Sequence, residues 1–293
     1  TYSSATVPTV YSLNNSKDGK QVQSIEDNAA LADKLKKYDL PTKEFFELTT
    51  ENGNKLNAWM IKPPNFDPSK KYPVYFNVYG GPGHNEVLDS WDGSDFMYHQ
   101  LLAQKGYIIF SVDPRGTMYQ GTKFKKSTYL ELGKLEIEDI INSAKELTKL
   151  PYVDGNRIGI MGWSYGGFMA SLAITKGADV FKMAIAVAPV TNWRYYDNIY
   201  TERFMRTPAE NEAGYDGNSP INFVDKMKNK FFLIHGSAND NVHYQNSMEM
   251  INALVKANKQ FDLFIYPDRN HGIYGGNTRN HLFTMMFDYV LKN

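Results

Sequence analysis

The chain has 293 residues, 42% of them hydrophobic, 22% charged and 14% aromatic, a globular profile that excludes low-complexity disorder and collagen-like repeats. Thirty-two Lys and Arg residues balance 32 Asp and Glu residues, so no basic excess favours a nucleic-acid partner. Cysteine is absent, which excludes disulfides, thiolate nucleophiles and cysteine-ligated metals.

The N-terminal residues carry no recognisable targeting signal. Thr1 to Ser4 include neither an initiator Met nor the charged segment of a signal peptide, so we expect the chain to be a fragment of a longer protein. No apolar run approaches the 18 residues or more that a membrane span needs. The residues themselves favour no particular cellular compartment.

The first 27 residues are expected to form β structure, because apolar residues flank a polar turn at 14–20 and alternate after it. A lone hairpin is marginal in water, so we expect these strands to complete a sheet that is otherwise missing. A short amphipathic helix is predicted over 28–37, with one apolar side formed by Ala30, Leu31 and Leu35. A second hairpin is predicted from 45–49 and 56–61.

From residue 72 short apolar runs alternate with helical periods. The runs predict strands at 74–79, 107–112, 157–161, 183–187, 231–235 and 261–266. Helices are predicted between them, at 96–105 and along two apolar faces, Ile137, Ile140, Ile141, Ala144 and Leu147, and Met248, Ile251, Leu254 and Val255. This alternation is typical of a mostly parallel sheet covered on both sides, so residues 28–293 are predicted to form one α/β domain.

A candidate nucleophile lies in Gly162-Trp163-Ser164-Tyr165-Gly166-Gly167, which contains the pattern Gly-x-Ser-x-Gly. A predicted strand precedes this segment and an apolar helix follows it. In such a strand–turn–helix a tight elbow lifts the serine hydroxyl above the sheet, and the two glycines avoid collisions with the neighbouring strand and helix. The alternative is an ordinary serine in a glycine-rich turn.

A serine nucleophile needs a base and an acid that orients it. His271 follows the last predicted strand in a polar loop, whereas His281 falls inside a helical pattern, so His271 is the predicted base. The acid is expected in the loop after the preceding strand, where Asp240 is the only carboxylate between Gly236 and His243. From the residues alone, Asp240 is the default acid.

Several segments resemble the dipeptidyl peptidase IV branch of the prolyl oligopeptidase family of serine peptidases. Besides the elbow, they are Asp113-Pro114-Arg115-Gly116-Thr117, Val187-Ala188-Pro189-Val190, Trp193-Arg194-Tyr195-Tyr196-Asp197, Tyr200-Thr201-Glu202-Arg203, Asn241-Val242-His243-Tyr244-Gln245 and His271-Gly272. The resemblance covers about 7–293. It implies an α/β-hydrolase fold, and it implies that residues 1–27 are the last strands of a β-propeller that is otherwise absent.

The resemblance also assigns roles to individual residues. Ser164 matches the nucleophile and His271 the general base, while Tyr79 and the backbone N–H of Tyr165 match the oxyanion hole. A pocket for proline or alanine at the penultimate substrate position is implied, formed by Tyr165, Val190, Trp193, Tyr196, Tyr200 and Val242. Without the resemblance, the alternative that Trp193, Tyr196 and Tyr200 are simply core residues at spacings of three and four stays open. Asn241 matches the amide that binds the second substrate carbonyl.

One position departs from the family pattern. The family's acid loop reads Asp-Asp-Asn-Val, and its first Asp is the triad acid, but this chain has Asn239 there. Asp240 matches the second, non-catalytic Asp. Three explanations compete: a natural or engineered substitution that cripples the enzyme, a loop shift that lets Asp240 serve as the acid, or a misassigned Asp. The loop shift is disfavoured, since neighbouring loop side chains usually point in different directions.

The predicted function is that of a serine exopeptidase releasing X-Pro or X-Ala dipeptides, with peptide substrates and no metal or cofactor. The alternatives are a non-catalytic relative that binds proteins and an acylaminoacyl peptidase or esterase. The resemblance further implies a homodimer, a propeller domain in the same chain that anchors the substrate amine, and a periplasmic or extracellular location. The apolar stretch 282–291 suits a dimer interface and suits equally a helix packed on its own sheet.

Overall fold

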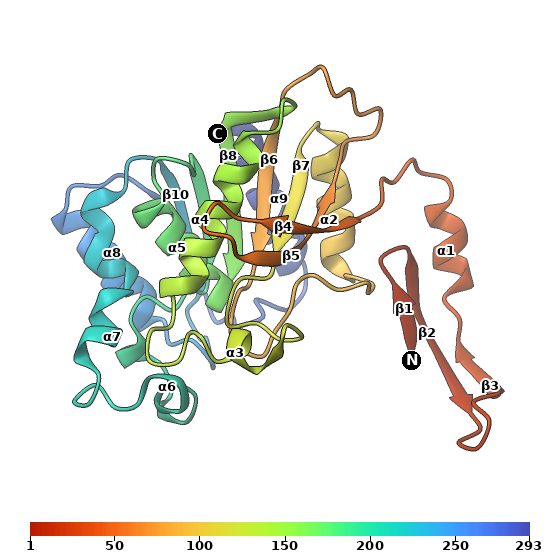
Figure 1. Cartoon of the computed structure of the whole chain (residues 1–293), viewed down its shortest axis with the longest axis horizontal. Coiled ribbons are helices and arrows are strands. Elements are labelled where there is room, and N and C mark those ends of the chain that lie inside the picture. Colours follow the sequence, from red (N-terminus) through yellow and green to blue (C-terminus); the bar gives the residue numbers. More distant parts are fainter.

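The N-terminal residues form a small antiparallel sheet to one side of the main body (Figure 1). The structure is a computed structural model and describes all 293 residues. The sheet has the order β1–β2–β3, with β1 at Tyr2–Ser4, β2 at Val7–Asn14 and β3 at Gln21–Glu26. Every residue of β3 is exposed, because no other layer covers this strand. The predicted β structure is confirmed.

Helix α1 at Ala29–Leu35 follows this sheet, and its predicted apolar side is wrong in part. Ala30 and Leu31 are exposed, and no residue of the helix is fully buried. The half-buried positions are Leu35, as predicted, and Ala32, and together with residues of β2 they line a surface cavity. The helix therefore packs on one thin layer rather than on a core.

The main sheet has eight strands in the order β11–β10–β9–β8–β6–β7–β5–β4. The strands are β4 at Glu44–Thr49, β5 at Lys55–Ile61, β6 at Tyr72–Val78, β7 at Ile108–Val112, β8 at Val153–Trp163, β9 at Met183–Val187, β10 at Lys230–Gly236 and β11 at Asp262–Tyr266. Strands β6 to β11 pair in parallel, whereas β4–β5 and β5–β7 pair antiparallel. The predicted mostly parallel sheet and the hairpin at its edge are confirmed.

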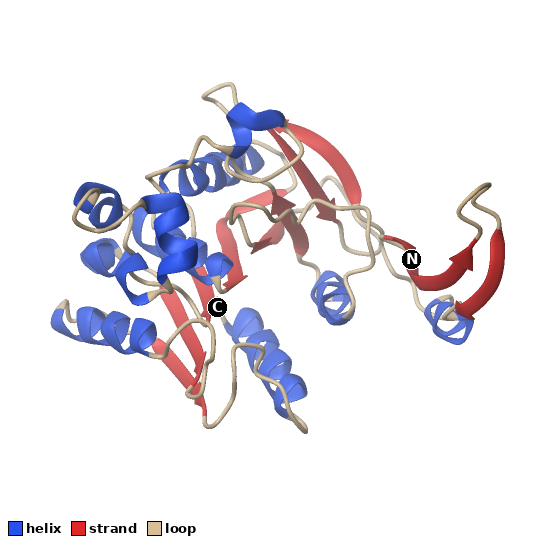
Figure 2. Cartoon of the chain, turned by 90° about the horizontal axis from the view of Figure 1, so that it is seen from below, coloured by secondary structure: helices blue, strands red, loops and turns tan.

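Helices cover both faces of this sheet, as Figure 2 shows from below. They are α2 at Ser94–Gln104, α3 at Gly121–Lys125, α4 at Lys134–Thr148, α5 at Tyr165–Lys176, α6 at Asn198–Met205, α7 at Glu212–Gly217, α8 at Gln245–Lys256 and α9 at Thr278–Lys292, with 3₁₀ turns η1 at Trp193–Tyr195 and η2 at Pro220–Lys226. One core packs α4, α5 and α8 against the sheet, and the other packs α2 and α9. Val74 and Phe76 of β6 join the first core and Tyr75 the second, as the two-residue period of a strand requires.

The predicted apolar face of α8 is wrong in part. Met248 and Val255 are 46% and 64% exposed, whereas Met250 and Leu254 are buried. The buried stripe begins with two polar residues, Asn246 and Ser247, whose side chains make hydrogen bonds beneath the helix. An apolar pattern cannot identify a face that is half polar. None of the helices has the length and apolar character that crossing a membrane requires.

Candidate active site

Ser164 lies on a sharp turn between the end of β8 and the start of α5. Its backbone has φ +60° and ψ −116°, a left-handed region that a non-glycine residue occupies only under constraint. A Cβ added to Gly162 would collide with the carbonyl of Gly166, and one added to Gly166 would collide with the carbonyl of Val78. The predicted strand–turn–helix is confirmed, and both glycines are sterically required.

His271 lies in the loop between β11 and α9, next to the elbow. The Trp163 indole N–H donates to the His271 carbonyl at 3.1 Å, which ties this loop to the residue that precedes Ser164. Burial lowers the pKa of His271, so the ring is readily neutral at physiological pH. The ring's hydrogen-bond partner is Asn239, whose side-chain NH₂ faces His271 Nδ1, and no hydrogen bond joins the ring to Ser164. The pairing of Ser164 with His271 stays a prediction; such contacts are often long in a protein without substrate.

Asn239 is nearly buried, at 9% exposure, in the loop after β10. Its Oδ1 accepts the backbone N–H groups of Asn241 at 3.0 Å and Val242 at 2.9 Å. These two donors fix the amide orientation, because a flipped amide would set its NH₂ against two N–H groups. Nδ2 therefore faces two imidazoles, at 3.1 Å from His271 Nδ1 and 3.1 Å from His235 Nε2.

Asp240 contacts the backbone of His271 rather than its ring. Its Oδ1 accepts the His271 backbone N–H at 3.0 Å, and this hydrogen bond lowers the pKa of the Asp240 carboxyl. The carboxylate also favours the protonated imidazole of His271 by its charge, a smaller effect than burial of the ring. The loop shift that would make Asp240 the acid is thus not adopted in this structure, and the residue at the imidazole Nδ1 is Asn239.

Tyr79 follows β6 and lies beside Tyr165, with ring centroids 5.9 Å apart. Burial raises the pKa of the Tyr79 hydroxyl, and the nearby Tyr196 and Glu86 raise it further, so the phenol stays a proton donor at neutral pH. Tyr79, Trp163 and His271 line one cavity of about 310 Å³. The structure thus brings the predicted oxyanion tyrosine, the predicted base and Trp163, the residue before Ser164, to a common space.

The predicted proline-pocket residues pack against one another. The Trp193 ring stacks on Tyr200 with centroids 5.8 Å apart and lies 5.4 Å from the ring of Tyr165. Val190 and Val242 are buried in the same core. Trp193 is only 2% exposed, so it supports the half-exposed rings of Tyr196 and Tyr200 rather than offering surface of its own.

Asn241 is positioned by one of these aromatic residues. The Tyr196 hydroxyl donates to Asn241 Oδ1 at 2.7 Å. Since the amide oxygen is engaged, the NH₂ group of Asn241 is the end that remains to bind a substrate carbonyl.

Glu136 on α4 is a buried carboxyl that sequence reasoning missed. The Tyr165 hydroxyl donates to its Oε1 at 2.7 Å, and the Gly133 N–H donates to its Oε2 at 3.0 Å. Burial raises the pKa of Glu136 to about 7, although both hydrogen bonds oppose that shift. A signal was present in the sequence, because Glu136 is four residues before Ile140 and therefore on the buried face of its helix.

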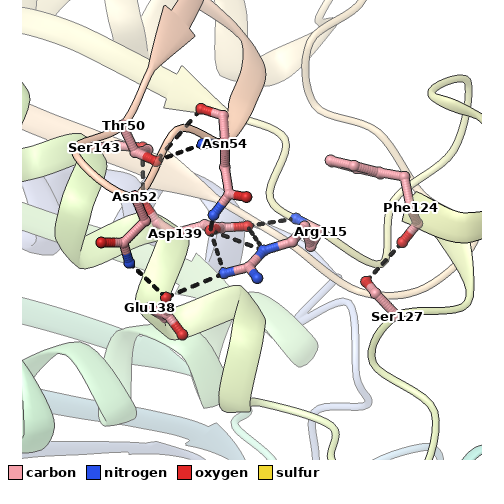
Figure 3. A network of polar contacts seen from close by, with 9 residues as sticks. All are labelled: Thr50, Asn52, Asn54, Arg115, Phe124, Ser127, Glu138, Asp139 and Ser143. Atoms are coloured by element: carbon pink, nitrogen blue, oxygen red, sulfur yellow. Dashed lines mark hydrogen bonds and ion pairs between the residues drawn. The ribbon is translucent and has the colours of Figure 1, made fainter.

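Arg115, in one of the segments that carried the resemblance, anchors α4. Its guanidinium makes an ion pair with the fully buried Asp139, at 2.7 Å, and also reaches Glu138 at 3.4 Å. Asn54, in the turn between β4 and β5, donates to Asp139 at 3.2 Å. Figure 3 shows these side chains converging from three segments of the chain. The network fixes the helix that carries Glu136 under the elbow.

No group of three or more His, Asp or Glu side chains in the chain is arranged to hold a metal ion.

The sheet and the serine elbow between β8 and α5 define an α/β hydrolase.

Comparison with known proteins narrows this class. Residues 94–293 match the model of the prolyl oligopeptidase family. The chain is 40% identical over 286 residues to prolyl endopeptidase FAP of Mus musculus, which covers 96% of the chain and 37% of that protein. The human FAP protein is 39% identical over 286 residues, with the same two coverages. The solved structure of dipeptidyl peptidase 4 from Porphyromonas gingivalis superposes with a TM-score of 0.96 at 47% identity, over 100% of this chain and 41% of that chain.

The chain therefore belongs to the prolyl oligopeptidase family of serine peptidases, in the branch that includes dipeptidyl peptidase 4 and FAP. It corresponds to the catalytic domain of these relatives and spans well under half of their length. The predicted family and fold are confirmed.

Proposed function

We propose that this chain is the catalytic domain of a serine exopeptidase that releases X-Pro or X-Ala dipeptides, and that Asn239 impairs its turnover. Ser164 attacks the peptide carbonyl and forms an acyl-enzyme, which water then hydrolyses. His271 accepts the serine proton and returns it to the leaving amine. The family membership supports the class of reaction, and the arrangement around the elbow supports these roles.

The oxyanion that forms during attack is assigned to two donors. The Tyr79 hydroxyl is protonated at neutral pH, and the Tyr165 N–H belongs to the first turn of α5. Donors aimed at the developing charge stabilise the transition state more than the substrate. The aromatic residues Tyr196 and Tyr200 suit a flat pyrrolidine ring, and the Asn241 amide suits the preceding carbonyl.

The contact between Asn239 and His271 is the main observation that supports an impaired turnover. The Asn239 NH₂ donates to His271 Nδ1 at 3.1 Å, so Nδ1 must present its lone pair. A neutral imidazole then carries its proton on Nε2, which is the nitrogen that has to accept the serine proton. A carboxylate at residue 239 would favour the opposite tautomer, as the acid of a serine triad does. The base is thus held in its unproductive form.

A non-catalytic relative that binds proteins is the second candidate, and the same contact favours it. Against it, the elbow retains its strained serine, and Tyr79 and His271 still line one cavity with Trp163. A site without catalytic use has no physical need for this arrangement. The predicted homodimer, the propeller in the same chain and the compartment remain part of the proposal.

Covalent labelling with a fluorophosphonate tests the proposal. The probe reports nucleophilic attack by Ser164 without requiring a complete peptide-binding site. We expect slow labelling of the natural protein, faster labelling of the Asn239→Asp variant, and none of Ser164→Ala. Absence of labelling in both the natural protein and Asn239→Asp would favour the non-catalytic relative.

A further inference from the structure

His235, at the end of β10, is a fully buried histidine that makes three polar contacts. Its Nδ1 lies 2.7 Å from Ser247 Oγ on α8. Its Nε2 lies 2.9 Å from the Val242 carbonyl and 3.1 Å from Asn239 Nδ2. Burial lowers the pKa of His235 to about 4, so the ring is neutral near pH 7. A neutral imidazole has one N–H and one lone pair to distribute among these contacts.

With asparagine at residue 239, one contact of His235 Nε2 is mismatched in either tautomer. If Nε2 carries the proton, it donates to the Val242 carbonyl, but it also faces the N–H of Asn239. If Nε2 carries the lone pair, it accepts from Asn239, but it then faces the lone pairs of the Val242 carbonyl. A buried mismatch of this kind costs free energy because no water relieves it.

A carboxylate at residue 239 would remove the mismatch. Protonated Nε2 would donate both to the Val242 carbonyl and to a carboxylate oxygen, while Ser247 Oγ–H donates to Nδ1. The other carboxylate oxygen would accept the N–H groups of Asn241 and Val242, which already bind the Asn239 oxygen. His271 Nδ1–H would complete the set. The side chain of residue 239 thus lies among four nitrogen atoms that can all donate to a carboxylate.

We propose that His235 is a positioning residue for the acid position, and that its Nε2–H donates to the residue 239 side chain only when that side chain is a carboxylate. This inference rests on the proposed function. The hydrogen bonds of His235 reach neither the proposed nucleophile nor the proposed base. Its effect on the reaction therefore passes through residue 239.

A double-mutant cycle between residues 235 and 239 tests this dependence. We expect His235→Leu to lower kcat on an X-Pro substrate by about tenfold or more in the Asn239→Asp variant, the value of a hydrogen bond to a charged group. In the natural protein the same change should alter kcat less than about twofold, because His235 donates no hydrogen bond to Asn239 that could be lost. KM should stay unchanged in both. His235→Gln should restore most of kcat in the Asn239→Asp variant, since a glutamine NH₂ can replace Nε2–H.

The free energy of unfolding in urea, measured over the same cycle, gives a readout that does not depend on catalysis. We expect Asn239→Asp to stabilise the folded protein more with histidine at residue 235 than with leucine. His235→Met, which likewise has no N–H to donate, serves if His235→Leu does not fold. Ser237→Ala is the matched control in the same loop. Ser237 Oγ accepts the Asp268 N–H at 2.9 Å and contacts neither imidazole, so its effect should be equal with either side chain at residue 239.

Equal effects of the His235 variants with either side chain at residue 239, in both kcat and unfolding, would overturn the inference. If Asn239→Asp raises turnover but this coupling is absent, the inference fails while the proposed function stands. If Asn239→Asp fails to raise turnover, the proposed function fails, and the unfolding cycle still decides the role of His235.

Discussion

The Tyr165 hydroxyl donates a 2.7 Å hydrogen bond to the buried carboxyl of Glu136, and this contact joins α4 to the residue that follows the proposed nucleophile. The Tyr165 ring also lies against Tyr79 and Trp193. The Tyr165 side chain therefore links α4, a helix packed on the sheet, to the proposed oxyanion hole and to the proposed proline pocket. The stability and the activity of this site should both respond to changes in α4.

Glu136 makes the stability of the protein depend on pH. Burial raises its pKa from 4.5 to about 7 in the folded protein, so the folded state holds a proton that the unfolded chain releases between these values. The free energy of unfolding should fall as pH rises from about 4.5 to 7, by an amount on the order of 3 kcal/mol. Glu136→Gln should remove this part of the pH dependence, and urea unfolding at pH 5 and pH 8 measures it.

The matched control is Glu138→Gln, a half-exposed position on the same helix, which should retain the pH dependence of the natural protein. Equal slopes in Glu136→Gln and in the natural protein would show that Glu136 titrates normally.

Removing the Arg115 side chain from its ion pair with Asp139 should cause a large loss of stability. Asp139 is fully buried, so Arg115→Ala would leave its carboxylate with only a backbone N–H and the Asn54 amide. Breaking such a pair costs about 3 kcal/mol or more, because the remaining charge has lost its counter-charge. The exposed pair of Arg157 with Asp154 offers a control, and Arg157→Ala should cost less than about 1 kcal/mol. Urea unfolding of both variants decides the comparison.

The elbow predicts a contrast between two glycines. A methyl group at Gly166 would collide with the backbone carbonyl of Val78, whereas a methyl group at Gly217 would meet nothing within 4 Å. Gly166→Ala should therefore misplace Ser164 and abolish fluorophosphonate labelling. Gly217→Ala should label at the natural rate. Labelling of Gly166→Ala at the natural rate would show that the turn tolerates a side chain.

The sequence predicted the sheet and the elbow because their signals are local. Strand runs, glycine spacing and the serine all lie within short windows, and a fixed hydrophobic period reports a buried face directly. The same logic missed what depends on distant partners. Ser247 and Glu136 are polar residues on buried helix faces, and their partners, His235 and Tyr165, are 12 and 29 residues away in the chain.

The orientation of the Asn239 amide is another property beyond local patterns. It follows from the backbone N–H groups of Asn241 and Val242, and only the folded loop brings these to the side chain. The sequence could raise the possibility of a wrong histidine tautomer, whereas the contact that favours it is a feature of the fold.

Tyr79 should stabilise the transition state and add little to the affinity for substrate. Removal of one oxyanion donor lowers kcat by about 10²–10³. Tyr79→Phe, made in the Asn239→Asp variant so that turnover is measurable, should show such a loss with nearly unchanged KM. Tyr119→Phe is a control at an exposed tyrosine and should leave both constants unchanged. A rise in KM at constant kcat for Tyr79→Phe would assign this tyrosine to substrate binding instead.

Asp240 is not expected to act as the acid. Its carboxylate accepts the backbone N–H of His271, so Asp240→Ala removes a loop contact and leaves the imidazole Nδ1 without change. In the Asn239→Asp variant we expect Asp240→Ala to keep kcat within about threefold, the order of one exposed hydrogen bond. A loss that approaches the whole gain from Asn239→Asp would assign the acid role to Asp240.

The turnover of Asn239→Asp on an X-Pro substrate, in the full-length natural protein, tests the central claim most directly. Replacing the amide with a carboxylate reverses the hydrogen bond to His271 Nδ1 and adds a counter-charge for the imidazolium. We expect kcat to rise by up to about 10⁴, with KM nearly unchanged, since the proposed pocket residues bind substrate without the acid. No gain in kcat, or full activity of the natural protein with asparagine verified at residue 239 by mass spectrometry, would contradict the account.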